Sequence, residues 1–183
     1  MRQSIQPPQP PFEFVRGHPE ILVYFDPDNN DDVYVQMERL AKYLSDIKLY
    51  REASIYFAWL TKQALSEKRK IQRVEDLKYV CNHWAASNDF LEDIKDNLVT
   101  AIITDNPAFI GDNVNIRQDP VLGKNVLGKL EFNEECQVLE RSDTRQRING
   151  TDAYWYKVRT TDDTEGWVYG QLLSFYLDLP PQT

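Results

Sequence analysis

The sequence of 183 residues contains few of the residue types on which most catalytic and metal sites depend. It has only two histidines, His18 and His83, and two cysteines, Cys81 and Cys136. Cys81 and His83 are two apart on a predicted helix, so their side chains point in different directions and form no ligand pair. Seven glycines and no glycine-rich phosphate motif argue against a nucleotide loop. We therefore predict that the protein is not an enzyme, with no catalytic residues, no metal and no cofactor.

Positive charge is also scarce, since 21 Lys and Arg against 29 Asp and Glu give a formal charge of −8. Phosphate backbones are bound by clustered Lys and Arg, so this balance argues against nucleic acid as a partner. No stretch approaches the ~20 apolar residues of a transmembrane helix, and we expect no membrane insertion. Residues 1–20 lack the apolar centre of a signal peptide. At face value this predicts a cytoplasmic protein, and a periplasmic or envelope location if a signal peptide was removed.

The sequence predicts helices between residues 33 and 102, and three segments precede them. Four proline residues in residues 1–12 favour a polyproline II arm. The apolar run Glu20–Phe25 predicts a short buried strand or an extended arm. Residues 26–32 are acidic and predict a cap for the next helix; a calcium loop is disfavoured because Asp31 occupies the position that requires glycine.

Apolar residues at helical spacing then recur between residues 33 and 102. The four predicted helices carry Val33, Met37, Leu40, Ala41, Leu44 and Ile47; Ala53, Tyr56, Phe57, Leu60 and Ala64; Val74, Leu77, Cys81 and Trp84; and Leu91, Ile94, Leu98, Ala101 and Ile102. Short links predict antiparallel neighbours, and Asn106-Pro107 ends the fourth helix. The segment Leu49–Phe57 resembles the middle of a tetratricopeptide repeat, and the alternative is an unrelated four-helix packing domain.

Five short segments after residue 112 carry the pattern of β-strands. They are Asn113–Arg117, Val126–Leu130, Cys136–Arg141, Trp155–Thr160 and Gly166–Tyr169. About five short strands in roughly 60 residues predict a small, strongly bent barrel. The two cysteines fall in different predicted domains, and we expect two buried thiols rather than a disulfide.

Seven sequence elements between residues 113 and 173 follow one another in a recognisable order. They are Asn115-Ile116-Arg117, Pro120, Val126-Leu127-Gly128-Lys129-Leu130, Gln137-Val138-Leu139, Trp155-Tyr156-Lys157-Val158, Gly166-Trp167-Val168 and Gln171-Leu172-Leu173. This order resembles the bacterial Src-homology-3-like (SH3b) family over about a third of the chain. Two features depart from the family pattern: Asn133 stands where a turn glycine is usual, and the polar insert Ser142–Tyr154 is long, which predicts a projecting hairpin loop.

The predicted ligand-binding residues are Tyr154, Trp155, Trp167, Tyr169 and Arg117. Exposed aromatic side chains are good binding anchors because they bury a large area at a low cost in entropy. The alternative for each ring is to fill the core of a small domain.

Strand alternation separates these rings from the core candidates. Trp155 and Lys157 point to one face and Tyr156 and Val158 to the other. Tyr156 and Val158 are therefore predicted in the core, and Trp155 on a partly exposed face.

The predicted fold class is α+β in several domains, with an N-terminal antiparallel α-helical hairpin domain followed by a small SH3-like β-barrel. The predicted boundaries are a proline-rich arm at 1–19, a helical, tetratricopeptide-like domain at 20–107, the barrel at 108–177 and a tail at 178–183. We expect Phe109 and Ile110 to pack and hold the two domains together.

The predicted function is that of a non-catalytic adaptor that binds a protein or peptide partner. The resemblance implies an alternative, an exported cell-envelope module that binds peptidoglycan or cell-wall peptide. The sequence does not indicate an oligomeric state.

Overall fold

The computed structural model describes residues 6–28, 31–66, 73–104 and 114–178. The chain divides into two compact units, and the division falls inside one helix, between Val80 and Cys81. Unit 1 contains the described residues up to Val80, and unit 2 contains Cys81–Asp178. The predicted boundary at residues 107 and 108 lies outside the described residues, as does the expected packing of Phe109 and Ile110.

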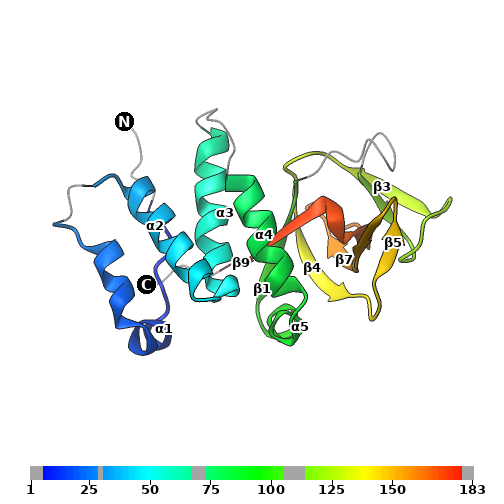
Figure 1. The fold of residues 1–183 in the computed structure, drawn as a ribbon. Coiled ribbons are helices and arrows are strands. Elements are labelled where there is room, and N and C mark those ends of the chain that lie inside the picture. Colours follow the sequence, from blue (N-terminus) through cyan, green and yellow to red (C-terminus); the bar gives the residue numbers. More distant parts are fainter. Residues whose placement is uncertain (1–5, 29–30, 67–72, 105–113, 179–183) are drawn as a thin grey trace. The chain divides into compact units, whose positions relative to one another are not determined.

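Unit 1 is helical, as the apolar spacing predicts (Figure 1). Its elements are α1 (Phe12–Gly17), the 3-10 helix η1 (Pro19–Phe25), α2 (Val33–Asp46), α3 (Tyr50–Ser66) and the first part of α4 (Arg73–Ala85). Their apolar faces meet in a core in which Ile21, Met37, Leu40, Leu44 and Leu77 are fully buried. The antiparallel hairpin arrangement stays a prediction.

The strand or extended arm expected at Glu20–Phe25 is wrong, because this run forms η1. Pro19 stands at the first helical position, where its missing N–H costs nothing. The Tyr43 hydroxyl donates a hydrogen bond to Glu20 at 2.8 Å, which fastens η1 to α2. A short apolar run does not distinguish a strand from a buried helical turn.

The predicted acidic cap of α2 is confirmed. Asp32 is the N-cap residue, and its carboxylate accepts a hydrogen bond from the backbone N–H of Tyr34 at 2.7 Å. Asp31 accepts from Gln36 and pairs with Arg39 at 2.8 Å. Asp31 and Asp32 thus both serve the start of α2, where the helix dipole favours negative charge.

Unit 2 combines the end of α4 and the short helix α5 (Asn88–Asp96) with two antiparallel sheets. Its strands are β1 (Leu98–Ile103), β2 (Val114–Arg117), β3 (Val126–Leu130), β4 (Glu135–Arg141), β5 (Gln146–Ile148), β6 (Thr151–Ala153), β7 (Trp155–Arg159), β8 (Glu165–Tyr169) and β9 (Leu173–Asp178), with the 3-10 turn η2 (Gly170–Leu172) before β9. The five predicted strands are all present, as β2, β3, β4, β7 and β8. The fold class α+β is therefore confirmed.

The fourth predicted helix is wrong in its second half, because α5 ends at Asp96 and residues 98–103 form β1. Asn97, at the C-cap of α5, has extended backbone angles (φ −134°, ψ 177°) that end the helix. The following run contains the β-branched residues Val99, Thr100, Ile102 and Ile103, which favour a strand. Leu98 and Ala101 match helical spacing only by coincidence, because they belong to a strand in which most residues are apolar.

The expected closed barrel is also wrong. The main sheet has seven strands in the order β3-β2-β8-β7-β4-β1-β9, and it is open, with β3 and β9 at its edges. The reason is the unpredicted pair β1 and β9: β1 pairs with the free edge of β4, and β9 continues the sheet from β1. The edge of β4 is therefore paired with β1, and the sheet continues through β1 to β9 instead of closing into a barrel.

An aromatic cluster holds α5 on the main sheet. The ring of Phe90, fully buried, lies 5.0 Å from Trp84, 5.7 Å from Tyr156 and 5.3 Å from Phe175 between ring centroids. The Trp84 indole N–H donates to the buried carboxylate of Asp93 at 3.1 Å, which satisfies both groups. This core fixes the inner face of β7, and so leaves the outer face of the sheet for the site described below.

Both cysteines are buried thiols without a disulfide among the described residues, as predicted, and both belong to unit 2. Among the described residues no helix is long and apolar enough to cross a membrane.

Candidate binding surface of the C-terminal sheet

The predicted alternation along β7 is confirmed. Tyr156 and Val158 are buried on the inner face of the sheet, where Tyr156 packs on Phe175 with ring centroids 4.5 Å apart. Lys157 points to the opposite, outer face and pairs with Glu140 of β4 at 3.6 Å. The outer face is therefore the one that a partner could reach.

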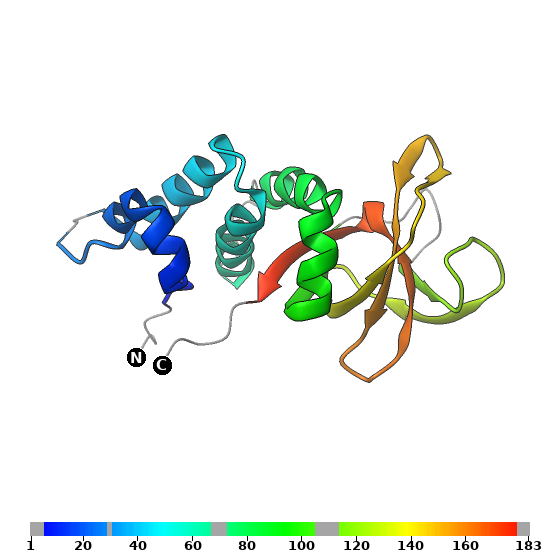
Figure 2. The same ribbon diagram turned by 90° about the horizontal axis from the view of Figure 1, so that it is seen from below.

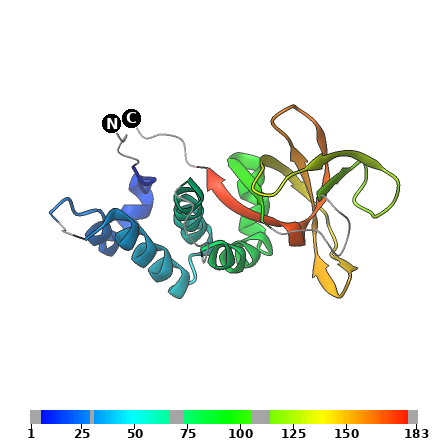
Figure 3. The ribbon, with the colours of Figure 1, turned by 90° about the horizontal axis from the view of Figure 1, so that it is seen from above.

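Trp155 lies on the outer side as predicted, but its expected partial exposure is wrong, because only 2% of its surface is exposed. The hairpin of β5 and β6 covers it: the Trp155 indole N–H donates to the Gln146 side chain at 2.5 Å. Figures 2 and 3 show this hairpin extending from the main sheet, as the long insert predicts. A sequence indicates that a loop is long, but not which side chain it covers.

Tyr169 is buried beside Trp155 for the same reason. The two residues are directly opposite in the pairing of β7 and β8, and their rings meet edge to face at 5.4 Å. The Tyr169 hydroxyl donates toward the backbone carbonyls of Gln146 and Thr151, at 2.8 and 2.5 Å, and burial raises its pKa. Trp155 and Tyr169 thus hold the β5–β6 hairpin on the outer face of the sheet.

Tyr154 is half-buried at the base of that hairpin. The guanidinium groups of Arg141 and Arg145 lie 4.4 and 5.1 Å from its ring centroid, a cation–π arrangement. Arg141 is held in turn by the carbonyls of Ala85 and Ser87. The face of Tyr154 is therefore already occupied by this chain's own cations.

Trp167 is the predicted aromatic residue that remains on the open part of the outer face. It is half-buried, between the buried residues Gly166 and Val168. Strand pairing places it directly opposite Arg117 of β2 on one side and Lys157 of β7 on the other. Directly opposite residues share a face, so Trp167 and Lys157 stand side by side.

Arg117 continues the same row toward the edge of the sheet, where it faces Val126 of β3. Its guanidinium is buried and donates to the Gly123 carbonyl at 2.6 Å and toward the Asn125 side chain at 3.4 Å. Burial lowers the pKa of Arg117, although an arginine stays protonated. The predicted ligand-binding Arg117 is thus engaged by the loop between β2 and β3.

This loop and the first two residues of β3 carry exposed apolar side chains that sequence reasoning missed. Val121, Leu122, Val126 and Leu127 are between 41 and 50% exposed, and we call them the loop surface. The loop keeps its shape from within, because the Asn125 amide donates to the carbonyls of Asp119 and Val121 at 3.2 and 3.4 Å. The available signal was the run of apolar residues around Asp119-Pro120, which the turn residues obscured.

The comparison with protein families decides what this domain is. Residues 112–174 match the family model described as bacterial SH3 domain, from β2 to the start of β9. The C-terminal domain is a bacterial SH3 domain. The match covers the seven quoted motifs and excludes β1, which explains why the sequence motifs do not predict that strand. Neither the comparison with curated proteins nor that with solved structures gives a match.

The departures from the SH3 pattern are accommodated in this domain. Asn133 has φ of +71°, the left-handed conformation for which the family uses glycine and which Asn tolerates. The insert becomes the β5–β6 hairpin. The resemblance of Leu49–Phe57 to tetratricopeptide repeats stays a prediction.

The outer face of the SH3 domain therefore has two parts. One part, with Trp155 and Tyr169, is closed by the hairpin. The other offers Trp167, Lys157 and, two strands away, the loop surface. Exposed apolar side chains and a half-buried indole on one domain are features suited to contact with another chain. Among the described residues no group of three His, Cys, Asp or Glu could hold a metal ion.

Proposed function

We propose that this protein is a non-catalytic interaction protein whose SH3 domain binds an extended peptide or a segment of a protein partner. The observation that carries the proposal is the loop surface, four apolar side chains between 41 and 50% exposed on one short segment of the domain. Single exposed apolar residues are normal, but a group of them on one segment of a domain that also carries a partly exposed Trp is typical of a binding surface. A bacterial SH3 domain is itself a module of a protein-binding or cell-wall-binding kind.

Within this proposal the five predicted residues have different roles. Trp167 contacts the partner, since it is the half-buried ring of the open outer face. Arg117 is a positioning residue, because its hydrogen bond to Gly123 holds the loop surface in place. Trp155, Tyr169 and Tyr154 support the hairpin and do not themselves contact the partner.

Cell-wall peptide is the second candidate ligand, and the family of the domain favours it. It would place the protein in the cell envelope, whereas a protein partner is compatible with the cytoplasm. The same surface would serve both functions, so the two candidates are separated by ligand and not by residue.

A two-armed selection tests the proposal with the full chain. In one arm the chain is used to select binders from a displayed library of random peptides; in the other it is sedimented with purified peptidoglycan. We expect selected peptides whose affinity falls about tenfold or more on Leu122→Ser and on Trp167→Ala. Retention on peptidoglycan that these two variants abolish would support the second candidate instead.

Phe132→Ser is the matched control, because Phe132 is 56% exposed in the same domain but lies outside the loop surface. It should leave binding unchanged. The proposal is wrong if neither arm gives binding, or if Phe132→Ser weakens binding as much as Leu122→Ser does.

A further inference from the structure

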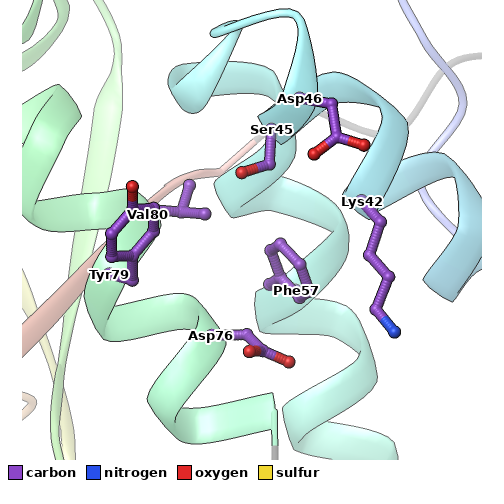
Figure 4. A pocket seen from close by; sticks show the side chains of 7 residues that line it. All are labelled: Lys42, Ser45, Asp46, Phe57, Asp76, Tyr79 and Val80. Atoms are coloured by element: carbon purple, nitrogen blue, oxygen red, sulfur yellow. The ribbon is translucent and has the colours of Figure 1, made fainter.

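Unit 1 contains a pocket that the SH3 domain does not share. It is lined by Lys42, Ser45 and Asp46 of α2, Phe57 of α3, and Asp76, Tyr79 and Val80 of α4 (Figure 4). Its volume is about 210 Å³, which suits one amino-acid side chain rather than a cofactor. The ring of Phe57 and the side chain of Val80 are buried and form an apolar floor.

Two carboxylates of this pocket have no cationic partner in the part of the chain that the structure describes. Asp46 and Asp76 lie on either side of the Phe57 ring in Figure 4, one from α2 and one from α4. No hydrogen bond or ion pair of either side chain is found among the described residues, in contrast to Asp31 and Asp32 at the start of α2. Lys42 does not compensate them, because its ammonium pairs with Glu38 at 3.1 Å.

The position of Asp46 adds a second reason to expect a cation. Asp46 is the last residue of α2, and the last turn of this helix contains no basic residue. The carbonyl groups at a helix C-terminus carry partial negative charge, which favours a cation and opposes a carboxylate. The C-terminus of α2 and the Asp46 carboxylate therefore both favour a cation at the opening of the pocket.

Tyr79 supplies the remaining wall. Tyr79 is 59% exposed, and it is the aromatic side chain at the solvent side of the pocket. A guanidinium stacks on aromatic rings and bonds carboxylates through its fork of N–H donors. A lysine ammonium is a compact point charge that gains less from this arrangement.

We infer that this pocket binds an arginine side chain presented by a protein partner. The formal charge of −8 favours the approach of a basic segment. The site is independent of the proposed function of the SH3 domain, since its residues all belong to unit 1.

Titration of the full chain with Nα-acetyl-arginine amide, followed by backbone amide chemical shifts in NMR, tests the inference. We expect roughly millimolar binding with shifts concentrated at residues 42–46 and 76–80. The citrulline analogue has the same shape without the charge, and it should cause no such shifts. The lysine analogue should bind roughly threefold more weakly or worse, because it lacks the fork of donors.

Substitutions of the pocket residues test which side chains bind the arginine probe. Asp46→Asn and Asp76→Asn should each weaken binding of the arginine probe about fivefold, and Tyr79→Leu about threefold. Glu75→Gln is the matched control, because Glu75 is the exposed neighbour of Asp76 and does not line the pocket. It removes the same charge from α4 and should leave the affinity unchanged.

The inference is overturned if the arginine probe shifts no pocket residue, if citrulline shifts them equally, or if Glu75→Gln weakens binding as much as Asp76→Asn. The Leu122→Ser variant separates the two proposals. It should bind the arginine probe normally even if the SH3 domain turns out to bind no peptide.

Discussion

At the scale of single residues, the crossing of β2 and β8 leaves no room for a side chain at Gly166. A Cβ atom there would lie 2.8 Å from the Arg117 carbonyl oxygen and would overlap the Ile116 side chain. We predict that Gly166→Ala lowers the free energy of unfolding by about 1–3 kcal/mol, since backbone has to move. Urea unfolding followed by circular dichroism measures it.

Gly128→Ala serves as the control for this prediction. Its added Cβ would meet only the Ile116 side chain, at an ordinary 3.9 Å. It should change stability by less than about 1 kcal/mol. Equal effects of the two substitutions would contradict the packing described for Gly166.

Cys136 makes stability depend on pH in the alkaline range. Burial first, and then the nearby carboxylates Glu134 and Glu135, raise the pKa of its thiol from 9.0 to about 12. The folded state therefore keeps a proton that the unfolded state releases. This stabilisation is fully present below pH 9 and is lost as the pH rises from there through about 12.

We predict that the unfolding free energy falls between pH 8 and pH 10 by about 1 kcal/mol more in the wild type than in Cys136→Ala. Urea unfolding at the two pH values measures the difference. Parallel pH profiles would show that the thiol is not protected by the fold.

At the scale of elements, the start of α2 depends on Asp32. Its carboxylate accepts the Tyr34 N–H at 2.7 Å, which satisfies one of the unpaired N–H groups of the first turn. We predict that Asp32→Ala lowers the free energy of unfolding by about 1 kcal/mol. Thermal and urea unfolding measure it. Asp28→Ala removes the same charge from the same exposed loop without a cap, and a comparable loss in that variant would contradict the capping role.

The elements that the sequence predicts well are those with a strict period or a fixed motif. Val114 and Ile116 alternate with polar residues, and Trp155–Val158 belongs to a motif, so β2 and β7 were predicted. Residues 98–103 match both the spacing of a helix and the composition of a strand. The extended backbone at Asn97 ends α5, and these residues then form β1. Local pattern does not reveal that the free edge of β4 takes an additional strand.

The binding surface was predicted only in part, for a related reason. Alternation along β7 correctly assigns faces, but exposure depends on distant segments that cover a face. Trp155 is covered by a hairpin, whereas Trp167 is not. The loop surface at Val121 and Leu122 has no periodicity from which it could have been predicted.

At the scale of the whole molecule, the two proposed sites belong to different units of the chain. The SH3 domain presents apolar side chains, and unit 1 presents a pocket with two carboxylates that have no cationic partner among the described residues. The first is suited to hydrophobic contact and the second to charge, so the two respond differently to salt. We predict that raising the ionic strength weakens the arginine probe strongly and peptides at the SH3 domain only slightly. Titrations of both ligands at low and high salt check this, and an equal salt response would argue against the division.

The most direct test of the central claim is hydrogen–deuterium exchange of the full chain with and without a peptide selected on it. The account predicts that the bound peptide slows exchange in residues 117–127 and 165–169, around the loop surface and Trp167. Slower exchange confined to the β5–β6 hairpin or to the helices of unit 1, with residues 117–127 unchanged, would contradict it.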